Sequence, residues 1–455
     1  MPRDRRARPV PAGVPVLLRR EMSQGCQEYN ALSRRALLSA MAPATTPQVV
    51  YHDRAIRNGM SASRDILVTV YLRGGCDGLS VVAPFADPAY YALRPTLAVP
   101  RPDQTTNARR GIALDNFYAI PQAMSPILPV YQAGDFAVVH ATGSTDQTRS
   151  HFDAQFFMEA GKPEKGMTSG WVGRHLASIT EMKPGALVRG VGLGANMAMI
   201  LEGSPRGMAI PSLEWVSMGG EQATEAKRTA WLQRAYETAP AILKDASEST
   251  IKTVQLLRGL NFRTDSYVSK GSLPYNPNTP NGNGLWYTDL GNSLKAAAAL
   301  IRGDVGVEAI HMDMGGWDTH DYQNPLDVNG TMSQLMWSLS GNLAAFWDDM
   351  RGANKIDSVT VVVMSEFGRT ARENGVYGTD HGHGNVMLLM GGNVNGGMVH
   401  GTFPGLASDL LADGDLAITT DYRDIVAEVV KKRLGNSRLS QIFPDYTPTM
   451  RGVVN

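Results

Sequence analysis

The most informative stretch for the fold is Ile66-Leu67-Val68-Thr69-Val70-Tyr71-Leu72-Arg73-Gly74-Gly75-Cys76-Asp77-Gly78. Residues 66–72 form a continuous apolar run of strand length, which is typical of a strand buried on both faces of a parallel sheet. The glycine-rich turn that follows presents one carboxylate, Asp77. Open α/β sheets build their sites from loops at strand ends. The stretch therefore predicts that the folded part begins with a buried strand that leads into a functional loop.

Apolar runs of similar length recur along the chain at 136–140, 307–312, 359–364 and 386–390. Helix-like stretches separate the later runs, most clearly at 326–350. Alternation of strands and helices is typical of a parallel sheet. The pattern predicts an α/β fold, a doubly wound and mostly parallel sheet with helices on both faces.

The beginning of the chain differs in composition from the rest. Ser33-Arg34-Arg35 is followed by a short apolar stretch and small residues, a pattern typical of a twin-arginine export signal. The alternative is a basic disordered tail with a chance arginine pair. We expect export to the periplasm or cell envelope through this signal, and a cytoplasmic protein if the signal is not functional. The predicted parts are a leader at 1–60, an α/β domain at 65–435, an insertion or cap within it at 165–285, and a C-terminal tail at 436–455.

The composition excludes several classes of function. The formal net charge of the 455 residues is zero, so nothing indicates nucleic acid or an anionic membrane surface as a partner. The two cysteines, Cys26 and Cys76, exclude a disulfide framework and a cysteine–zinc site. No apolar stretch reaches the roughly 18 residues that a membrane span needs.

Carboxylates and imidazoles gather in two glycine-flanked runs, Gly315-Gly316-Trp317-Asp318-Thr319-His320 and Gly378-Thr379-Asp380-His381-Gly382-His383-Gly384. These groups are ligands favoured by zinc and manganese. Asp318 and His320 alternate across one residue, so in an extended segment both side chains point the same way. Either His381 or His383 is expected to bind the metal. A solvated turn and a set of purely structural hydrogen bonds remain the alternatives.

Two further segments carry candidate site residues. Glu366 follows the apolar run 359–364 and is a candidate ligand or base, while Arg369 either binds an anionic group or pairs with Glu366. Ser150 precedes His151 at a predicted helix start, where a serine acts as a nucleophile or simply as a cap. The other hydroxyl groups that compete for the nucleophile role are those of Thr142, Ser144, Thr145 and Thr148.

Five ordered motifs within 65–435 resemble the alkaline phosphatase/sulfatase superfamily, and more closely an uncharacterised bacterial family within it whose members typically carry twin-arginine signals. The motifs are Arg73-Gly74-Gly75-Cys76-Asp77-Gly78-Leu79-Ser80, Arg149-Ser150-His151-Phe152-Asp153, Gly315-Gly316-Trp317-Asp318-Thr319-His320, Ser365-Glu366-Phe367-Gly368-Arg369-Thr370 and Asp380-His381-Gly382-His383-Gly384.

The resemblance implies a bimetallic site that hydrolyses or transfers phosphate and sulfate esters through a Ser, Thr or modified Cys. One ion would take Asp318, His320 and either His381 or His383. The other would take Asp77 and Glu366. The chain departs from the superfamily where Phe367 replaces an imidazole ligand, and no nucleophile stands at the expected spacing.

We therefore predict an exported, metal-dependent hydrolase of small anionic phosphate or sulfate esters, holding one or two zinc or manganese ions. Ser150, His151 and Arg369 are its predicted catalytic residues. The alternative is a catalytically inactive relative that serves as a structural or binding protein of the cell envelope, with an envelope component as its partner.

Overall fold

The computed structural model describes residues 64–455 except 220–221, 280–281, 283 and 285–286. The predicted leader at 1–60, with its twin-arginine signal, lies outside the described residues. The described chain forms the predicted α/β fold around a nine-stranded sheet of order β10-β4-β9-β8-β1-β7-β5-β6, with β11 beside β4. The strands are β1 Ile66–Leu72, β4 Phe136–Gly143, β5 Gly190–Leu193, β6 Gly207–Ala209, β7 Ala309–Met314, β8 Val359–Met364, β9 Asn385–Met390, β10 Val399–His400 and β11 Thr420–Asp421.

Strand β1 is central, and it pairs in parallel with β7 on one side and β8 on the other. Its side chains alternate between two hydrophobic cores. Val68 and Val70 lie in the core shared with α10 (Asp289–Arg302) and α11 (Thr331–Gly352). Leu67 and Tyr71 lie in the core shared with α7 (Trp171–Ser178), α12 (Tyr422–Lys432) and α13 (Leu439–Ile442). Fully burying such a side chain stabilises the fold by about 1.5–3 kcal/mol. The continuous apolar run in the sequence reflects this burial on both faces.

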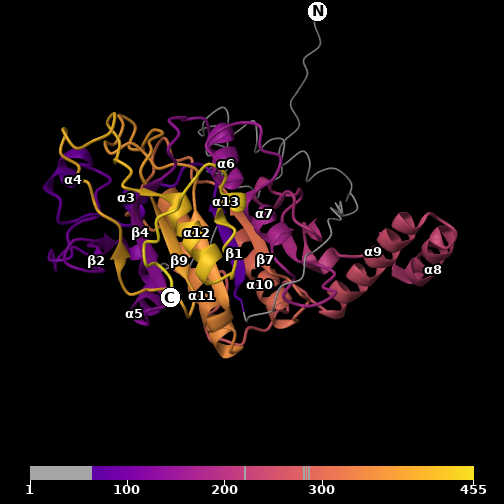
Figure 1. The fold of residues 1–455 in the computed structure, drawn as a ribbon. Coiled ribbons are helices and arrows are strands. Elements are labelled where there is room, and N and C mark those ends of the chain that lie inside the picture. Colours follow the sequence, from indigo (N-terminus) through magenta and orange to yellow (C-terminus); the bar gives the residue numbers. More distant parts are fainter. Residues whose placement is uncertain (1–63, 220–221, 280–281, 283, 285–286) are drawn as a thin grey trace, which may run out of the picture.

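Helices cover both faces of the sheet, as predicted (Figure 1). A second, two-stranded sheet pairs β2 Ile112–Ala113 with β3 Ala119–Ile120. The α-helices are α3 Gly78–Val81, α4 Pro88–Leu93, α5 Leu128–Gln132, α6 His151–Ala160, α7 Trp171–Ser178, α8 Glu225–Tyr236, α9 Ala241–Gly259, α10 Asp289–Arg302, α11 Thr331–Gly352, α12 Tyr422–Lys432 and α13 Leu439–Ile442. Short 3-10 helices lie at η1 Gln122–Ile127, η2 Met199–Leu201, η3 Leu213–Trp215, η4 Gln222–Thr224 and η5 Ile356–Ser358.

Strand β9 sets the geometry of the site because it runs antiparallel to both β4 and β8. Its amino end, at Asn385, therefore lies at the edge of the sheet where β4 and β8 end. Strands β1 and β7 also end at this edge, since both run parallel to β8 or β1. The histidine-rich segment before β9 is thus brought beside the loops that follow the other four strands.

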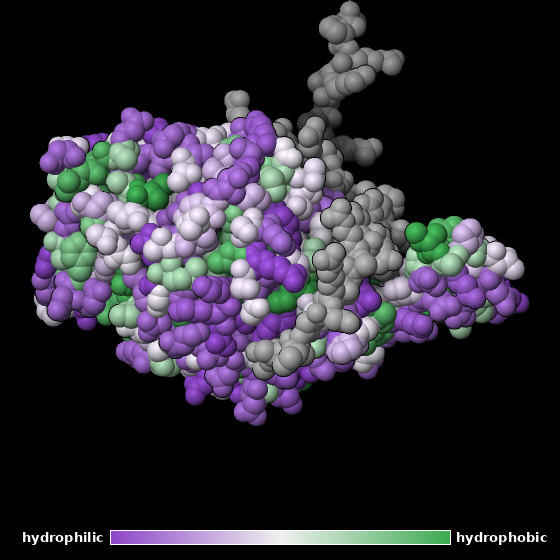
Figure 2. Space-filling model, in the orientation of Figure 1, coloured by the Kyte–Doolittle hydropathy of each residue, from purple (hydrophilic) through white to green (hydrophobic). Residues whose placement is uncertain are grey.

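The region 165–285, predicted as an insertion or cap, contributes two kinds of structure. Strands β5 and β6 extend the main sheet beyond β7. Helices α8 and α9 instead form an arm that projects from the body (Figure 1), with apolar groups gathered along its upper edge (Figure 2). The predicted domain boundaries stay predictions. In the described part of the chain, no helix is both long and apolar enough to cross a membrane.

Candidate metal centre

The turn after β1 approaches the loop after β7 so closely that only glycine fits. Gly74 has a φ of +118°, and a Cβ added there would lie 2.5 Å from the backbone nitrogen of Asp318. Gly75 has a φ of +70°, and its Cβ would lie 2.6 Å from the ring of Phe367. L side chains rarely adopt such backbone conformations. The two glycines therefore hold the β1, β7 and β8 loops together at the edge of the sheet.

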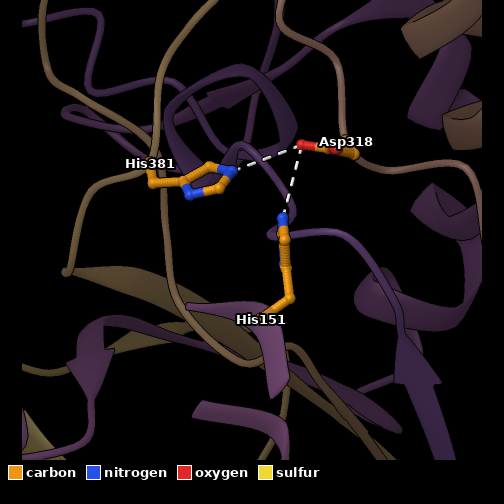
Figure 3. A group of neighbouring side chains, drawn as sticks. All are labelled: His151, Asp318 and His381. Carbon is orange, nitrogen blue, oxygen red and sulfur yellow. Dashed lines mark ion pairs between the residues drawn. The ribbon is translucent and has the colours of Figure 1, made fainter. Parts of the chain in front are cut away.

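One carboxylate oxygen, Oδ1 of Asp318, is the focus of this edge. The Nε2 atoms of three histidines surround it, two of them drawn in Figure 3. Burial alone would raise the pKa of Asp318, but the three imidazoles and a guanidinium together hold that pKa well below its usual range. The atoms around Oδ1 are His320 Nε2 at 3.1 Å, His151 Nε2 at 3.5 Å, His381 Nε2 at 3.5 Å and Arg369 Nη2 at 2.7 Å.

The three histidines share one arrangement, because each Nδ1 lies within hydrogen-bond distance of an oxygen acceptor. A neutral imidazole with its proton on Nδ1 presents a lone pair at Nε2, which is the form that binds a metal. All three Nε2 atoms face Asp318. The Nδ1 pairs are His151 with Glu366 Oε1 at 2.8 Å, His320 with Asp380 Oδ1 at 3.0 Å, and His381 with the carbonyl oxygen of Arg149 at 2.8 Å.

The donor set fits a single zinc-like ion. Ligand atoms of His151, Asp318 and His381 all lie within 4.8 Å of one another. Both histidines are 3.5 Å from the carboxylate oxygen. Ligands of a tetrahedral zinc ion with bonds of about 2.1 Å are separated by about 3.4 Å. His320 Nε2 is 3.0 Å from His381 Nε2 and supplies a fourth donor.

In the metal-free protein, a proton on His151 compensates the negative charges of Asp318 and Glu366. Burial opposes a charge on His151, yet the carboxylates of Asp318 and Glu366 raise the pKa of that imidazole to about 9. For His381 burial dominates and lowers the pKa. By its distances, His151, predicted as a catalytic residue, lies among the candidate metal ligands.

Glu366 lies behind His151 and orients it. The carboxylate is buried and accepts hydrogen bonds from Gly74 N at 2.8 Å and Gln155 Nε2 at 2.9 Å, besides its contact with His151. Burial raises the pKa of Glu366, but His151 and Gln155 outweigh it and lower that pKa. Gln155 was not predicted as a site residue, because an amide is not a typical metal ligand and only the geometry of α6 brings it to Glu366.

Asp77 belongs to a separate network, which contradicts its predicted pairing with Glu366 on a second ion. Its two oxygens form a bidentate ion pair with Arg94, with N–O distances of 2.7 and 3.0 Å. Ser80 and Gln323 donate further hydrogen bonds, both 2.6 Å long. The carboxylate is thus compensated by an arginine and fully bonded. We therefore remove Asp77 from the ligand set.

His383 also lies apart from the ligand group. Its Nδ1 is 2.9 Å from Asp415 Oδ2, and the same oxygen accepts a hydrogen bond from Arg149 at 2.9 Å. Asp415 raises the pKa of His383. This network fastens the segment before α6 to the chain before β11. Of the two histidines that the sequence left open, the geometry favours His381 as the ligand.

Arg369 was predicted either to bind an anionic group or to pair with Glu366, and the structure instead pairs its guanidinium with Asp318. The side chain is 1% exposed, and its ion pair is with Asp318 rather than with Glu366. It positions Asp318 and has no donor left for an anionic substrate. Its other N–H groups donate to the carbonyl oxygens of Gly74, Gly75, Trp317 and Thr379, and Nη1 also lies 3.5 Å from His320 Nε2.

Ser150 is the N-cap residue of α6 by its extended backbone, and it directly precedes His151. Phe367 occupies the place where the resemblance implied an imidazole. Its ring lies 4.8 Å from that of His151 and 4.9 Å from that of His381, so it packs the ligands from one side.

Comparison with known proteins gives one family match. A family model described as "Protein of unknown function (DUF1501)" matches residues 288–438, a segment that contains Asp318, His320 and His381. No curated protein matches the sequence.

Several solved structures resemble the fold at low identity, and alkaline phosphatase superfamily proteins are among them. Ps i-CgsB has a TM-score of 0.36 and 8% identity, over 84% of this chain and 74% of that chain. A protein in the alkaline phosphatase superfamily from Vibrio parahaemolyticus has a TM-score of 0.31 and 9% identity, over 73% of this chain and 61% of that chain. The PsFucS1 sulfatase from Pseudoalteromonas sp. has a TM-score of 0.32 and 10% identity, over 86% of this chain and 70% of that chain. Because all three TM-scores are low, these likenesses transfer no residue role to this chain.

Proposed function

We propose that this protein binds one divalent cation through His151, Asp318, His381 and His320, and uses it to hydrolyse phosphate or sulfate esters. The observation that carries the proposal is the convergence of three Nε2 atoms on one carboxylate oxygen. A set of three imidazoles and one carboxylate favours zinc, with manganese as the second candidate.

The fixed orientation of the imidazoles distinguishes this group from an ordinary hydrogen-bond cluster. His320 Nε2 and His381 Nε2 are 3.0 Å apart, and both Nδ1 atoms already face acceptors. Two lone pairs at that distance repel each other unless a cation or a shared proton lies between them. A divalent ion held by His320, His381 and Asp318 would remove this repulsion.

The ligand group is reachable from one side. His151 is fully buried, whereas the side chains of His320 and His381 are 25% and 13% exposed. A bound ion would neutralise the nonbridging oxygens of an ester that enters from this side. Ser150 is our candidate nucleophile, since the amino end of α6 stabilises negative charge.

The predicted export is part of this proposal and rests on the arginine pair at 34–35. The alternative, an inactive metal-binding protein of the cell envelope, is favoured by two observations. Arg94 already compensates Asp77, and Phe367 provides no ligand, so the described residues assemble no second ion site of the kind that the resemblance implied.

The experiment compares two double variants of the full chain by metal analysis and by titration calorimetry with Zn²⁺ and Mn²⁺. Asp318→Ala/His320→Ala should lose the ion. The matched control is His311→Ala/Asp313→Ala. These two residues of β7 are also separated by one position, with His311 Nε2 3.1 Å from Asp313 Oδ1, but they lie outside the ligand group. The control variant should retain the ion. Wild-type protein that binds neither metal would refute the proposal.

Turnover is tested separately on metal-loaded protein with 4-nitrophenyl phosphate and 4-nitrophenyl sulfate. Hydrolysis that disappears in Asp318→Ala/His320→Ala and persists in the control supports the esterase. Tight metal binding without turnover of any ester would instead favour the binding protein.

A further inference from the structure

Two exposed tyrosines, Tyr322 and Tyr377, lie beside the metal centre and take no part in it. Their side chains are 55% and 51% exposed. The ring centroids are 5.9 Å apart with an interplanar angle of 40°, so the two rings form one aromatic surface. Aromatic side chains bury large apolar areas when they gain a partner. Here about half of each side chain is exposed to solvent.

Both tyrosines also have backbone conformations that disfavour their side chains. Tyr322 has a φ of +45° and Tyr377 a φ of +62°, which is left-handed helical space that glycine and asparagine adopt more easily. Asn324, close by in the same segment, has a similar φ of +46°. Strain of this kind persists where the surrounding structure imposes it, and it clusters at binding sites.

The surroundings of the tyrosines explain how the strain is maintained. Tyr322 N donates to Val376 O at 3.0 Å, and Gln323 N donates to Tyr377 O at 2.9 Å, so the two turns are joined. The turn at 374–378 is closed by Asn374, whose Oδ1 accepts from the backbone nitrogens at positions 376 and 378. None of these bonds uses a tyrosine ring. The fold therefore requires the turns but not the aromatic side chains.

The same turns are attached to a metal-ligand candidate. Asn374 Nδ2 donates to the carbonyl oxygen of His320 at 2.7 Å and contacts Asp380, the carboxylate that orients this histidine, at 3.3 Å. Tyr322 follows His320 by two residues, which places their Cα atoms within about 7 Å. His320 and Asp380 are on the exposed side of the ligand group. The aromatic surface thus borders the side from which an ester enters.

We infer that Tyr322 and Tyr377 form the subsite for the alcohol part of the ester, and that this part is a ring with a flat apolar face. Aryl groups and sugar rings both present such a face. The inference rests on the proposed function and deepens it by naming the substrate class. An ester whose phosphorus or sulfur lies at the ligand group would rest its ring on the tyrosines.

The test removes the rings without disturbing the turns. Tyr322→Asn and Tyr377→Asn suit the left-handed backbone, and Tyr322→Phe and Tyr377→Phe keep the rings. Trp231→Ala, at a tryptophan that is 67% exposed on the arm, controls for loss of any exposed aromatic group. The Asn variants should raise the KM for 4-nitrophenyl phosphate roughly 3- to 10-fold, as expected for an aromatic pair, with kcat retained and thermal stability at or above that of wild type. The KM for methyl phosphate should not change, and the Phe and Trp231→Ala variants should behave as wild type.

A glucose phosphate serves as the second substrate and distinguishes sugar from aryl recognition. Titration calorimetry of the zinc-loaded protein with 4-nitrophenyl phosphate, glucose phosphate and methyl phosphate gives a measurement that needs no turnover. If the wild type binds the ring compounds but does not hydrolyse them, and the Asn variants lose this binding, the subsite is supported. The same result would refute the proposed esterase activity. Equal effects of the Asn variants on all three compounds, or no effect on any, would overturn the subsite.

Discussion

Asp318→Asn is the most informative single substitution, because it keeps the shape of the side chain and removes its charge. The affected atom, Oδ1, contacts Arg369 Nη2 at 2.7 Å and the Nε2 atoms of three histidines within 3.5 Å. Removing one partner of a buried ion pair costs about 3–5 kcal/mol. Arg369 keeps its bonds to four carbonyl oxygens, so we expect the lower end, about 3 kcal/mol. Removing a group that supports a metal ligand weakens binding about 10- to 100-fold. Loss of the anionic ligand itself should therefore weaken zinc binding at least 100-fold.

Asp77→Asn is the matched control. Asp77 is also a buried carboxylate paired with an arginine, at 2.7 Å from Arg94, but it lies outside the ligand group. Urea unfolding of the metal-free proteins should show a similar loss of stability for both variants. Zinc titration should show lost affinity for Asp318→Asn alone. Zinc affinity within a few-fold of wild type in Asp318→Asn, or an equal loss in Asp77→Asn, would refute this account of the site.

The other predictions concern the groups around Asp318. Glu366→Gln should weaken zinc binding roughly 10- to 100-fold by calorimetry, because Glu366 orients His151; an unchanged affinity would contradict that role. Gly74→Ala should lower the melting temperature far more than Gly166→Ala, since both glycines have positive φ but only a Cβ at Gly74 meets backbone atoms. The folded-state pKa of His151, about 9 against 6.5, should stabilise metal-free protein below pH 6.5 by about 3 kcal/mol, a contribution lost as the pH rises to 9. Zinc bound to His151 would displace that proton, so zinc affinity should rise over the same window. A flat affinity from pH 6.5 to 9 would exclude His151 as a ligand.

The sheet was predictable because its central strands are buried on both faces. Residues 66–72 were expected as a strand and form β1, and 359–364 form β8 with the same bounds. Orientation was not predictable. An apolar run such as 386–390 looks the same whether its strand is parallel or antiparallel, and only the pairing of β9 with β4 and β8 fixes its direction. That direction is what places His381 at the carboxyl edge.

The site was predictable only in part, because ligand-type residues do not reveal their partners. Asp318, His320 and His381 stand in glycine-flanked loops, and the structure brings these three side chains together, while their role as ligands stays a proposal. Asp77 shows the same signal, yet Arg94, seventeen positions later in the sequence, binds both its oxygens in a pairing that depends on tertiary structure. His151 was assigned to catalysis because it adjoins a serine. Its contact with Glu366 spans 215 positions of sequence, so no local pattern could indicate it.

The charges around the ligand group bear on how many ions it holds. Three carboxylates contact the ligand imidazoles, those of Asp318, Glu366 and Asp380. One guanidinium, Arg369, is fixed against Asp318. Three negative charges and one positive charge leave two negative charges, which a single divalent ion balances. A second divalent ion would leave an excess of positive charge in a mostly buried place, where an uncompensated charge is costly. With Arg369 as a fixed cation beside Asp318, we therefore expect this centre to hold one ion rather than two.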